Sequence, residues 1–143
     1  MPADDFLSEN TTTRDDARAP AVNAAGVSAW GPPRYLTRIA VKSVSRIVIV
    51  QVADIVRLEA EDNYVRLWAD RPYLHKETLT RLIELLDPAE FLRVHRSHAV
   101  NIQAVRELRP LLHGEYLIAL SNGTELTSGR SYRAMIQHTF GLA

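Results

Sequence analysis

Short alternating segments separated by turn signals dominate the sequence from Thr37 onward. Residues 55–60 and 64–69 both alternate, and the polar turn Glu61-Asp62-Asn63 lies between them. Because successive side chains of a β-strand point to opposite faces, this period of two predicts half-buried strands. No strand–helix–strand repeat of the kind that builds parallel sheets is present. The pattern therefore predicts a mainly antiparallel β fold.

The two segments that flank the turn each have two distinct faces. In residues 55–60, one face carries Val56, Leu58 and Ala60, and the other, expected to face solvent, carries Ile55, Arg57 and Glu59. In residues 64–69, one face carries Val65, Leu67 and Ala69, and the other carries Tyr64, Arg66 and Trp68. A face with Tyr, Arg and Trp is unusual for plain solvent. It indicates either a binding surface or a face that another sheet covers.

Helical spacing occurs twice. The first predicted helix has an apolar stripe at i, i+3, i+4 and i+7, formed by Leu79, Leu82, Ile83 and Leu86. A final helix is predicted to begin at Ser128 or Gly129, with an inner stripe of Tyr132, Met135, Ile136 and Phe140. Before it, Asn122-Gly123 predicts a hairpin with a type I′ turn. The sequence thus adds two short helices to the β fold.

Residues 1–33 are rich in Ala, Thr, Asn, Asp, Gly and Pro and have no apolar period. We expect a disordered tail or linker there, followed by a single domain over residues 34–143. No apolar run approaches the roughly 20 residues of a membrane-spanning helix, and no secretory signal is evident, so we expect a cytoplasmic protein. The lack of cysteine excludes disulfides, thiolate zinc sites and cysteine nucleophiles.

Arginine supplies nearly all of the positive charge. The chain has 17 basic and 17 acidic side chains, and Lys42 and Lys76 are its only lysines. Five acidic and two basic side chains fall in residues 1–33, so the domain itself carries a basic excess. The planar fork of arginine matches phosphates and guanine edges. The excess indicates either nucleic-acid binding or simply the codon usage of a high-GC genome.

Residues 91–101 hold the densest polar cluster. Ser97 stands between His95 and His98, which raises the possibility of a nucleophile with its base, or of a metal-binding histidine pair. However, no nucleophile elbow is present, and no carboxylate at metal-ligand spacing supplies a third ligand. We therefore expect no catalytic residue, no metal and no cofactor.

DNA recognition accounts better for this cluster and for a second one at residues 127–133. A forked arginine such as Arg96 reads guanine O6 and N7, whereas His95 and Ser97 are donors suited to phosphates. Arg130 lies where a helix begins, so its charge opposes the helix dipole, and an approaching phosphate would relieve this. The alternative for Arg130 is a solvated arginine on a surface helix.

Several ordered motifs span about residues 37–140. They are Ile55-x-x-Leu58-Glu59-Ala60-x-Asp62-Asn63-Tyr64-Val65, Thr78-Leu79, Phe91-x-Arg93-x-His95-Arg96-Ser97-x-x-Val100-Asn101, Gly123 and Ser128-x-Arg130. Together they resemble the LytTR DNA-binding domain of bacterial transcription regulators of the LytR/AlgR type. His98 and Ala99 depart from the family pattern, which has an aromatic and a larger aliphatic residue there.

The resemblance implies an elongated stack of small antiparallel β-sheets with two short helices, which enters successive major grooves through loops. It implies base contacts from Arg96, Arg130 and the loop at Asn63 and Tyr64. The residues for which it implies phosphate contacts are His95, Ser97, Ser128, Arg133 and Arg66. The implied partner is double-stranded DNA with tandem repeat elements. We expect a free monomer that places two copies on such DNA.

The predicted function is sequence-specific control of transcription, without enzymatic activity. The alternative is a β-rich protein-interaction module whose arginine-rich loops bind an acidic partner. Many family members are response regulators with an N-terminal receiver domain, and residues 1–33 are too short to be one. We therefore expect a stand-alone regulator, a fusion from which the receiver domain is missing, or control by a regulatory partner protein.

Overall fold

A computed structural model describes residues 34–142 of the chain. The predicted tail or linker over residues 1–33 lies outside the described residues. The elements of the described part are β1 (Arg38–Lys42), β2 (Ile47–Gln51), η2 (Val52–Asp54), β3 (Arg57–Glu61), β4 (Tyr64–Trp68), β5 (Pro72–His75), α1 (Leu79–Leu85), β6 (Phe91–His95), β7 (His98–Asn101), η3 (Ile102–Ala104), β8 (Val105–Pro110), β9 (Tyr116–Leu120), β10 (Glu125–Thr127), η4 (Arg130–Tyr132) and α2 (Arg133–Thr139). The η elements are short 3-10 helices. No helix within residues 34–142 is long and apolar enough to cross a membrane.

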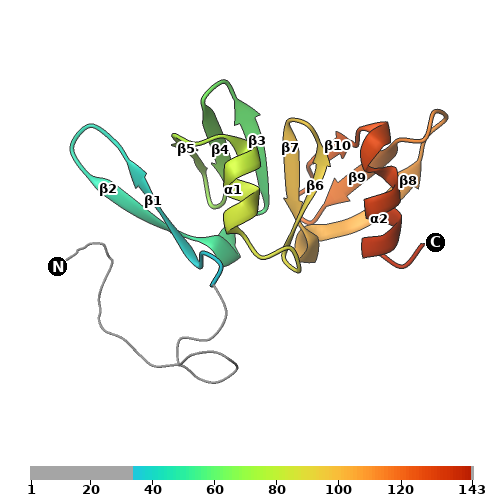
Figure 1. Cartoon of the computed structure of the whole chain (residues 1–143), viewed down its shortest axis with the longest axis horizontal. Helices are drawn as coiled ribbons and strands as arrows, with labels where there is room; N and C mark the ends of the chain where they lie inside the picture. Colours follow the sequence, from blue (N-terminus) through green and yellow to red (C-terminus); the bar gives the residue numbers. More distant parts are fainter. Residues whose placement is uncertain (1–33, 143) are drawn as a thin grey trace, which may run out of the picture. The chain divides into compact units, whose positions relative to one another are not determined.

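The strands form three antiparallel sheets. β1 pairs with β2, the five-stranded sheet has the order β5-β4-β3-β7-β6, and the three-stranded sheet has the order β10-β9-β8. Figure 1 shows α1 beside the five-stranded sheet and α2 beside the three-stranded sheet. The prediction of a mainly β fold with small antiparallel sheets and two short helices is confirmed.

The first hydrophobic core lies between α1, the β1–β2 hairpin and one face of the five-stranded sheet. Leu58 and Leu67 of the sheet and Leu82 of α1 are fully buried in it. The Thr78 hydroxyl accepts a hydrogen bond from the Arg81 N–H at 3.2 Å, which caps the first turn of α1. The predicted stripe is confirmed by burial of Leu79, Leu82 and Leu86, with Ile83 partly buried beside them.

The second core lies between the three-stranded sheet, α2 and the β6–β7 hairpin, and it includes Ile118 and Ile136. The β6–β7 hairpin belongs to both cores. Its side chains in the first core are Phe91 and Ala99, and those in the second core are Leu92, Val94 and Val100. Both faces of this hairpin are therefore packed, which restrains the turn at its tip.

Two predicted side-chain orientations are wrong. Ile55 is fully buried, because η2 precedes it and β3 begins only at Arg57, so the period of two does not extend back to Ile55. Met135 is 55% exposed instead of packed inward. Because α2 begins at Arg133 after the separate turn η4, helical spacing within α2 turns Ile136 and the partly buried Phe140 toward the core.

The hairpin predicted at Asn122-Gly123 is confirmed, since β9 and β10 pair across it. Its turn is not type I′, which requires a positive φ at both central residues. Gly123 has a φ of 89°, but Asp62 is the one non-glycine residue of the described part with a positive φ. The Gly123 N–H donates to the Leu120 carbonyl at 3.0 Å, and the loop has three residues with glycine at its positive-φ position.

Candidate nucleic-acid interface

Arg96 and Ser97 form the tip of the β6–β7 hairpin, between the paired residues His95 and His98. Arg96 is exposed, whereas Ser97 is partly buried. The Ser97 N–H donates to Nδ1 of His95 at 3.1 Å. With Nδ1 as acceptor, the neutral imidazole carries its proton on Nε2 and becomes a donor there. The tip therefore carries the guanidinium of Arg96 next to the Nε2–H donor of His95.

Arg93 holds this tip in place from within the hairpin. Its Nε donates to the His95 carbonyl at 3.3 Å, and its Nη2 donates to the Arg96 carbonyl. Its Nη1 donates to the Thr80 hydroxyl at 2.9 Å, which ties the tip to α1. Arg93 is part of the sequence motif but had no predicted role, because its bonds to backbone carbonyls depend on the hairpin. It is a positioning residue for Arg96.

The segment that carries Arg130 lies against the base of the same tip. The Gly129 N–H donates to the Val94 carbonyl at 2.8 Å. A Cβ at Gly129 would lie 3.6 Å from Cδ2 of His95 and 3.3 Å from Cδ2 of Tyr132, so glycine permits this close approach. Arg130 follows at once and is exposed. The fold thus brings the two arginine clusters of the sequence together.

The β8–β9 turn lies close to Arg130 and Arg133. A Cβ at Gly114, whose φ is +90°, would lie 3.7 Å from Cδ of Arg133 and 3.9 Å from Cγ of Arg130. Arg130, Arg133 and the neighbouring His113 are all exposed. The sequence showed His113-Gly114 only as a break between strands, because nothing local indicates that this turn meets Arg133. The turn adds a border to the candidate interface that sequence reasoning missed.

The β3–β4 turn lies at the same end of the five-stranded sheet as the Arg96 tip. The Ala60 N–H donates to the Ser97 carbonyl at 2.8 Å. Asp62 adopts a φ of 57° in this two-residue turn, and Asn63 and Tyr64 are exposed beside it. Figure 1 shows this turn, the β6–β7 turn and the beginning of α2 along one edge, uppermost in the view. The predicted base-contact residues therefore share one edge.

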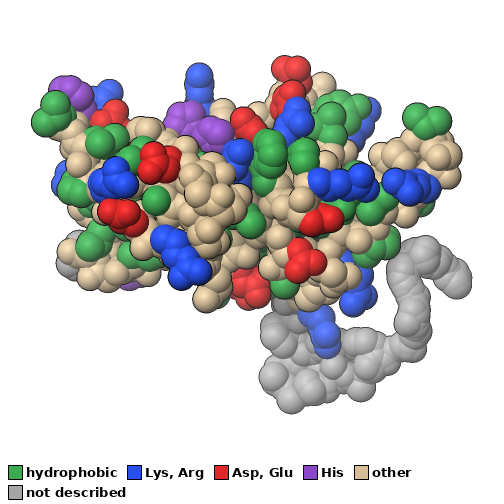
Figure 2. All heavy atoms as spheres, turned by 180° about the vertical axis from the view of Figure 1, so that it is seen from behind, with side chains coloured by type: hydrophobic (Ala, Val, Ile, Leu, Met, Phe, Trp, Pro, Cys, Tyr) green, Lys and Arg blue, Asp and Glu red, His purple; other side chains and the backbone are tan. Residues whose placement is uncertain are grey.

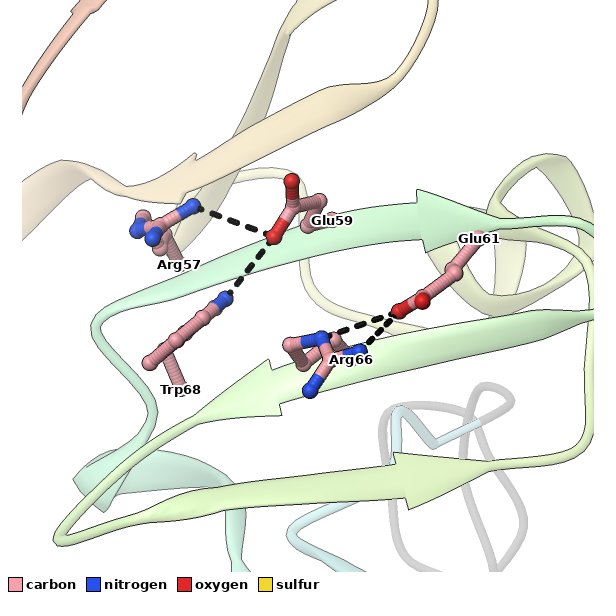
Figure 3. Close-up of polar contacts among 5 residues, drawn as sticks. All are labelled: Arg57, Glu59, Glu61, Arg66 and Trp68. Carbon is pink, nitrogen blue, oxygen red and sulfur yellow. Dashed lines mark hydrogen bonds and ion pairs between the residues drawn. The ribbon is translucent and has the colours of Figure 1, made fainter.

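Below the β3–β4 turn, the sheet face carries a network of polar contacts (Figure 3). Nε1 of Trp68 donates to Glu59 at 3.2 Å, and Nη1 of Arg57 lies 3.6 Å from the same carboxylate oxygen. The Arg57 guanidinium lies over the Trp68 ring, 4.5 Å from its centroid. Burial lowers the pKa of Arg57, and Glu59 partly opposes this. The aromatic face is thus covered by an arginine of its own sheet.

His98 is half-buried beside this network, and its Nδ1 has no hydrogen-bond partner within residues 34–142. Burial lowers its pKa, Glu59 opposes the change, and the nearby His95 and Arg57 lower the pKa further. The rings of His95 and His98 are 5.3 Å apart between centroids. No third His, Asp or Glu in the described part joins them as a metal site.

The arrangement offers hydrogen-bond donors and cations. The bond between Ser97 and His95 comes from the Ser97 backbone and not from its hydroxyl, so the pair does not have the geometry of a nucleophile and its base. Figure 2 shows basic side chains interspersed with acidic ones over the face drawn there, without a single large basic patch.

The sequence model described as the LytTr DNA-binding domain matches residues 45–141. The chain belongs to the LytTR family. It is 30% identical to the sensory transduction protein LytT of Bacillus subtilis (strain 168) over 96 residues, which are 66% of this chain and 40% of that protein. It is 32% identical to the heme-containing CO-sensing transcriptional regulator RcoM 2 of Paraburkholderia xenovorans (strain LB400) over 125 residues, 86% of this chain and 46% of that protein.

The LytTR chain thus spans less than half the length of these curated relatives. A solved LytTr DNA-binding domain from a Bacillus cereus response regulator matches its structure with a TM-score of 0.68 and 25% identity. The match covers 74% of this chain and 98% of that chain. The resemblance inferred from the motifs is confirmed, and the LytTR family is one of DNA-binding domains of transcriptional regulators.

Two of the predicted phosphate-contact residues of this LytTR domain are engaged elsewhere. Ser128 is 2% exposed, and its hydroxyl accepts a hydrogen bond from the Tyr116 N–H at 2.9 Å. Its prediction as a phosphate contact is therefore corrected: Ser128 joins the segment before Arg130 to β9. Arg66 is partly exposed, but its Nε donates to Glu61 at 2.9 Å. Arg66 thus shares its guanidinium with Glu61, and its Nη1 group is not part of that pair.

Proposed function

We propose that this LytTR domain binds double-stranded DNA sequence-specifically and reads the major groove through its turns to control transcription. The observation that carries the proposal is the Gly129–Val94 hydrogen bond of 2.8 Å, which brings the Arg130 segment against the hairpin that ends in Arg96. The two segments that carry the exposed Arg96 and Arg130 therefore lie next to each other. Restrained donors at a surface edge suit recognition of base edges in a groove.

Arg96 and Arg130 are the proposed base readers. An arginine that donates two hydrogen bonds to guanine O6 and N7 contributes about 1–3 kcal/mol of discrimination against other bases. Arg96 is suited to this role, because Arg93 holds its backbone while its own side chain is exposed. Arg130 begins η4 at the surface and lies one residue after Gly129, whose N–H donates to the Val94 carbonyl. Asn63 and Tyr64 supply the third contact from the β3–β4 turn.

The proposed phosphate contacts surround these base readers. His95 and Ser97 stand on either side of Arg96, and Arg133 lies beside Arg130 at the β8–β9 turn. Imidazole, hydroxyl and guanidinium groups all donate to phosphate oxygens, and they carry no sequence information of their own. Arg66 joins this set through the guanidinium N–H groups that its pair with Glu61 leaves unused. These contacts fix the register of the domain on DNA.

The proposed arrangement on DNA is two copies on tandem repeats, with the free protein a monomer in the cytoplasm. Repeats spaced by one or two helical turns, about 10–21 base pairs, place both copies on one face of the duplex. A receiver domain on a longer chain, or a separate regulatory protein, would supply the signal. Insertion of about 5 base pairs between the repeats should abolish cooperativity and leave single-site affinity unchanged.

Fluorescence anisotropy with a preferred duplex and a scrambled duplex tests the proposal. Arg96→Ala and Arg130→Ala should each cost about 1–3 kcal/mol of affinity for the preferred duplex and little for the scrambled one. Arg133→Ala should weaken both equally and reduce the salt dependence. Arg106→Ala is the matched control, because Arg106 is exposed near the start of β8, away from the β8–β9 turn. Equal losses for both duplexes in Arg96→Ala would refute base reading by Arg96.

A further inference from the structure

The only two lysines of the chain line one hollow on the surface. Lys42 ends β1 and Lys76 follows β5, and both border a hollow of about 380 Å³. Ala40, Tyr64, Leu74 and His75 complete its lining. Tyr64 is also a proposed base-contact residue, so the hollow opens directly beside the edge that we propose to face DNA.

The fold places both lysines there for local reasons. β1 alternates buried Ile39 and Val41 with exposed Ala40 and Lys42, so one face of this strand packs in the first core and the other borders the hollow. On β5, His75 pairs with Val65 of β4, next to the β3–β4 turn. Lys76 follows immediately and is exposed. The side chains of both lysines therefore begin near Tyr64.

Two acidic residues next to the lining, Glu77 beside Lys76 and Glu61 paired across the hairpin with Tyr64, already have partners. Glu77 accepts a hydrogen bond from the Thr78 N–H at 3.0 Å, and Glu61 pairs with Arg66. Within residues 34–142, neither Lys42 nor Lys76 forms a salt bridge with a carboxylate. The lining thus has two lysine charges, and the His75 ring and the Tyr64 hydroxyl add further hydrogen-bonding groups. This is the chemistry of an anion site at a surface.

We propose that the hollow holds a DNA backbone phosphate that flanks the base pairs contacted from the β3–β4 turn. The inference rests on the proposed function and extends the footprint beyond Asn63 and Tyr64, on the side away from Arg130. Lys42 precedes residue 45, where the match to the LytTR family begins. An ammonium group binds phosphate as a compact charge and reads no base, so this contact raises affinity for all sequences.

Salt-dependent binding of the whole chain tests the proposal. We would compare the wild type with Lys42→Gln/Lys76→Gln, the charge-preserving Lys42→Arg/Lys76→Arg and the control Arg106→Gln. Loss of one neutralised phosphate should reduce the slope of log K against log salt by about 0.9, a roughly fivefold loss of affinity near 0.15 M salt. The Gln double variant should show this loss equally for preferred and scrambled duplexes. The Arg double variant and Arg106→Gln should show little change.

A second arm locates the contact on the DNA. Removing the flanking base pairs beyond the position contacted by Asn63 should weaken the wild type, and it should not weaken Lys42→Gln/Lys76→Gln further. If the wild type binds DNA but the double variant keeps both its salt slope and its dependence on that flank, the hollow is not a phosphate site and the proposed function stands. If the wild type binds no duplex, the proposed function itself fails. An unchanged melting temperature in the variants excludes a folding effect.

Discussion

The β6–β7 hairpin and the β3–β4 hairpin end at the same edge but are supported differently. Side chains of the β6–β7 hairpin pack into both hydrophobic cores, and Arg93 binds the carbonyls of its turn. The β3–β4 hairpin packs only its Leu58, Val65 and Leu67 face into the first core. Its other face carries the ion pairs and the Trp68 contact of Figure 3. The β6–β7 hairpin is thus packed on both faces, whereas the β3–β4 hairpin is packed on one face and carries polar contacts on the other.

The difference in support bears on which turn is better suited to reading bases. A long, flexible arginine loses less freedom on binding when its backbone is already held, so a base reader benefits from the packed hairpin. The outer face of the β3–β4 hairpin instead carries partly exposed ion pairs, which contribute little to stability. Of the two hairpins, we therefore propose that the Arg96 tip contributes more to base discrimination than the Asn63 turn does.

Removing a core side chain that supports the β3–β4 hairpin should produce the largest change, a loss of folding stability. Leu82 is fully buried in the first core, so Leu82→Ala should lower the free energy of unfolding by about 2–5 kcal/mol. Hydrogen exchange should show a greater loss of protection in β3 and β4 than in β6, which keeps its second core. Denaturant unfolding measures the first effect. A loss below about 1 kcal/mol would contradict the described packing.

Removing the Arg93 hydrogen bonds that position the Arg96 tip should have the next largest effect, a loss of DNA affinity. Arg93→Gln deletes the charged bonds to the carbonyls of His95 and Arg96. We expect about a tenfold loss of affinity for the preferred duplex, equivalent to ~1.4 kcal/mol, a magnitude typical of a charged hydrogen bond. The salt slope should stay unchanged, because Arg93 acts through Arg96. A reduced slope would instead identify Arg93 as a phosphate contact.

A pH titration probes the junction between the two hairpins at His98. Because burial lowers the pKa of His98, the unfolded chain binds its proton more tightly than the folded chain does. Stability should therefore fall as pH decreases below the ordinary value of 6.5, toward the lower pKa of the folded state. His98→Phe should lose less stability between pH 7.5 and 5.5 than the wild type in thermal unfolding. An identical pH dependence would show that His98 does not carry the effect.

Removing the ion pair beside the β3–β4 turn should change DNA affinity least. Glu61→Gln frees Arg66 and removes a negative charge beside the β3–β4 turn. We expect DNA affinity to increase modestly, by about 0.5 kcal/mol, for preferred and scrambled duplexes alike. Glu107→Gln is the matched control, since Glu107 also forms an exposed pair, with Arg109 on β8. Weaker DNA binding by Glu61→Gln would show that Arg66 depends on Glu61 for its position.

Local patterns predicted much of the fold. The stripe of Leu79, Leu82 and Leu86 predicted α1, because a helix repeats its buried face within a few residues. The Asn122-Gly123 signal predicted a hairpin but not its turn type, which depends on how β9 and β10 pair. Ile55 was misplaced because the preceding 3-10 helix changes the phase of the strand pattern.

The sequence could predict exposed arginines at the candidate site but not the contacts that support them. The motifs singled out Arg96 and Arg130, which are both exposed, and their roles in DNA binding stay predictions. Burial of Ser128 depends on a hydrogen bond to Tyr116, and the role of Arg93 depends on carbonyls at a hairpin tip. These contacts join segments whose proximity only the folded chain establishes. The hollow of Lys42 and Lys76 arises in the same way.

Selection of bound sites from a random duplex library, with the wild type and with Arg96→Ala in parallel, tests base reading by the Arg96 tip. The wild type should enrich a short element, and Arg96→Ala should lose preference at one base-pair position while keeping the others. Such a result would assign that position to the packed hairpin. A selected element that is identical for both proteins would contradict base reading by the Arg96 tip.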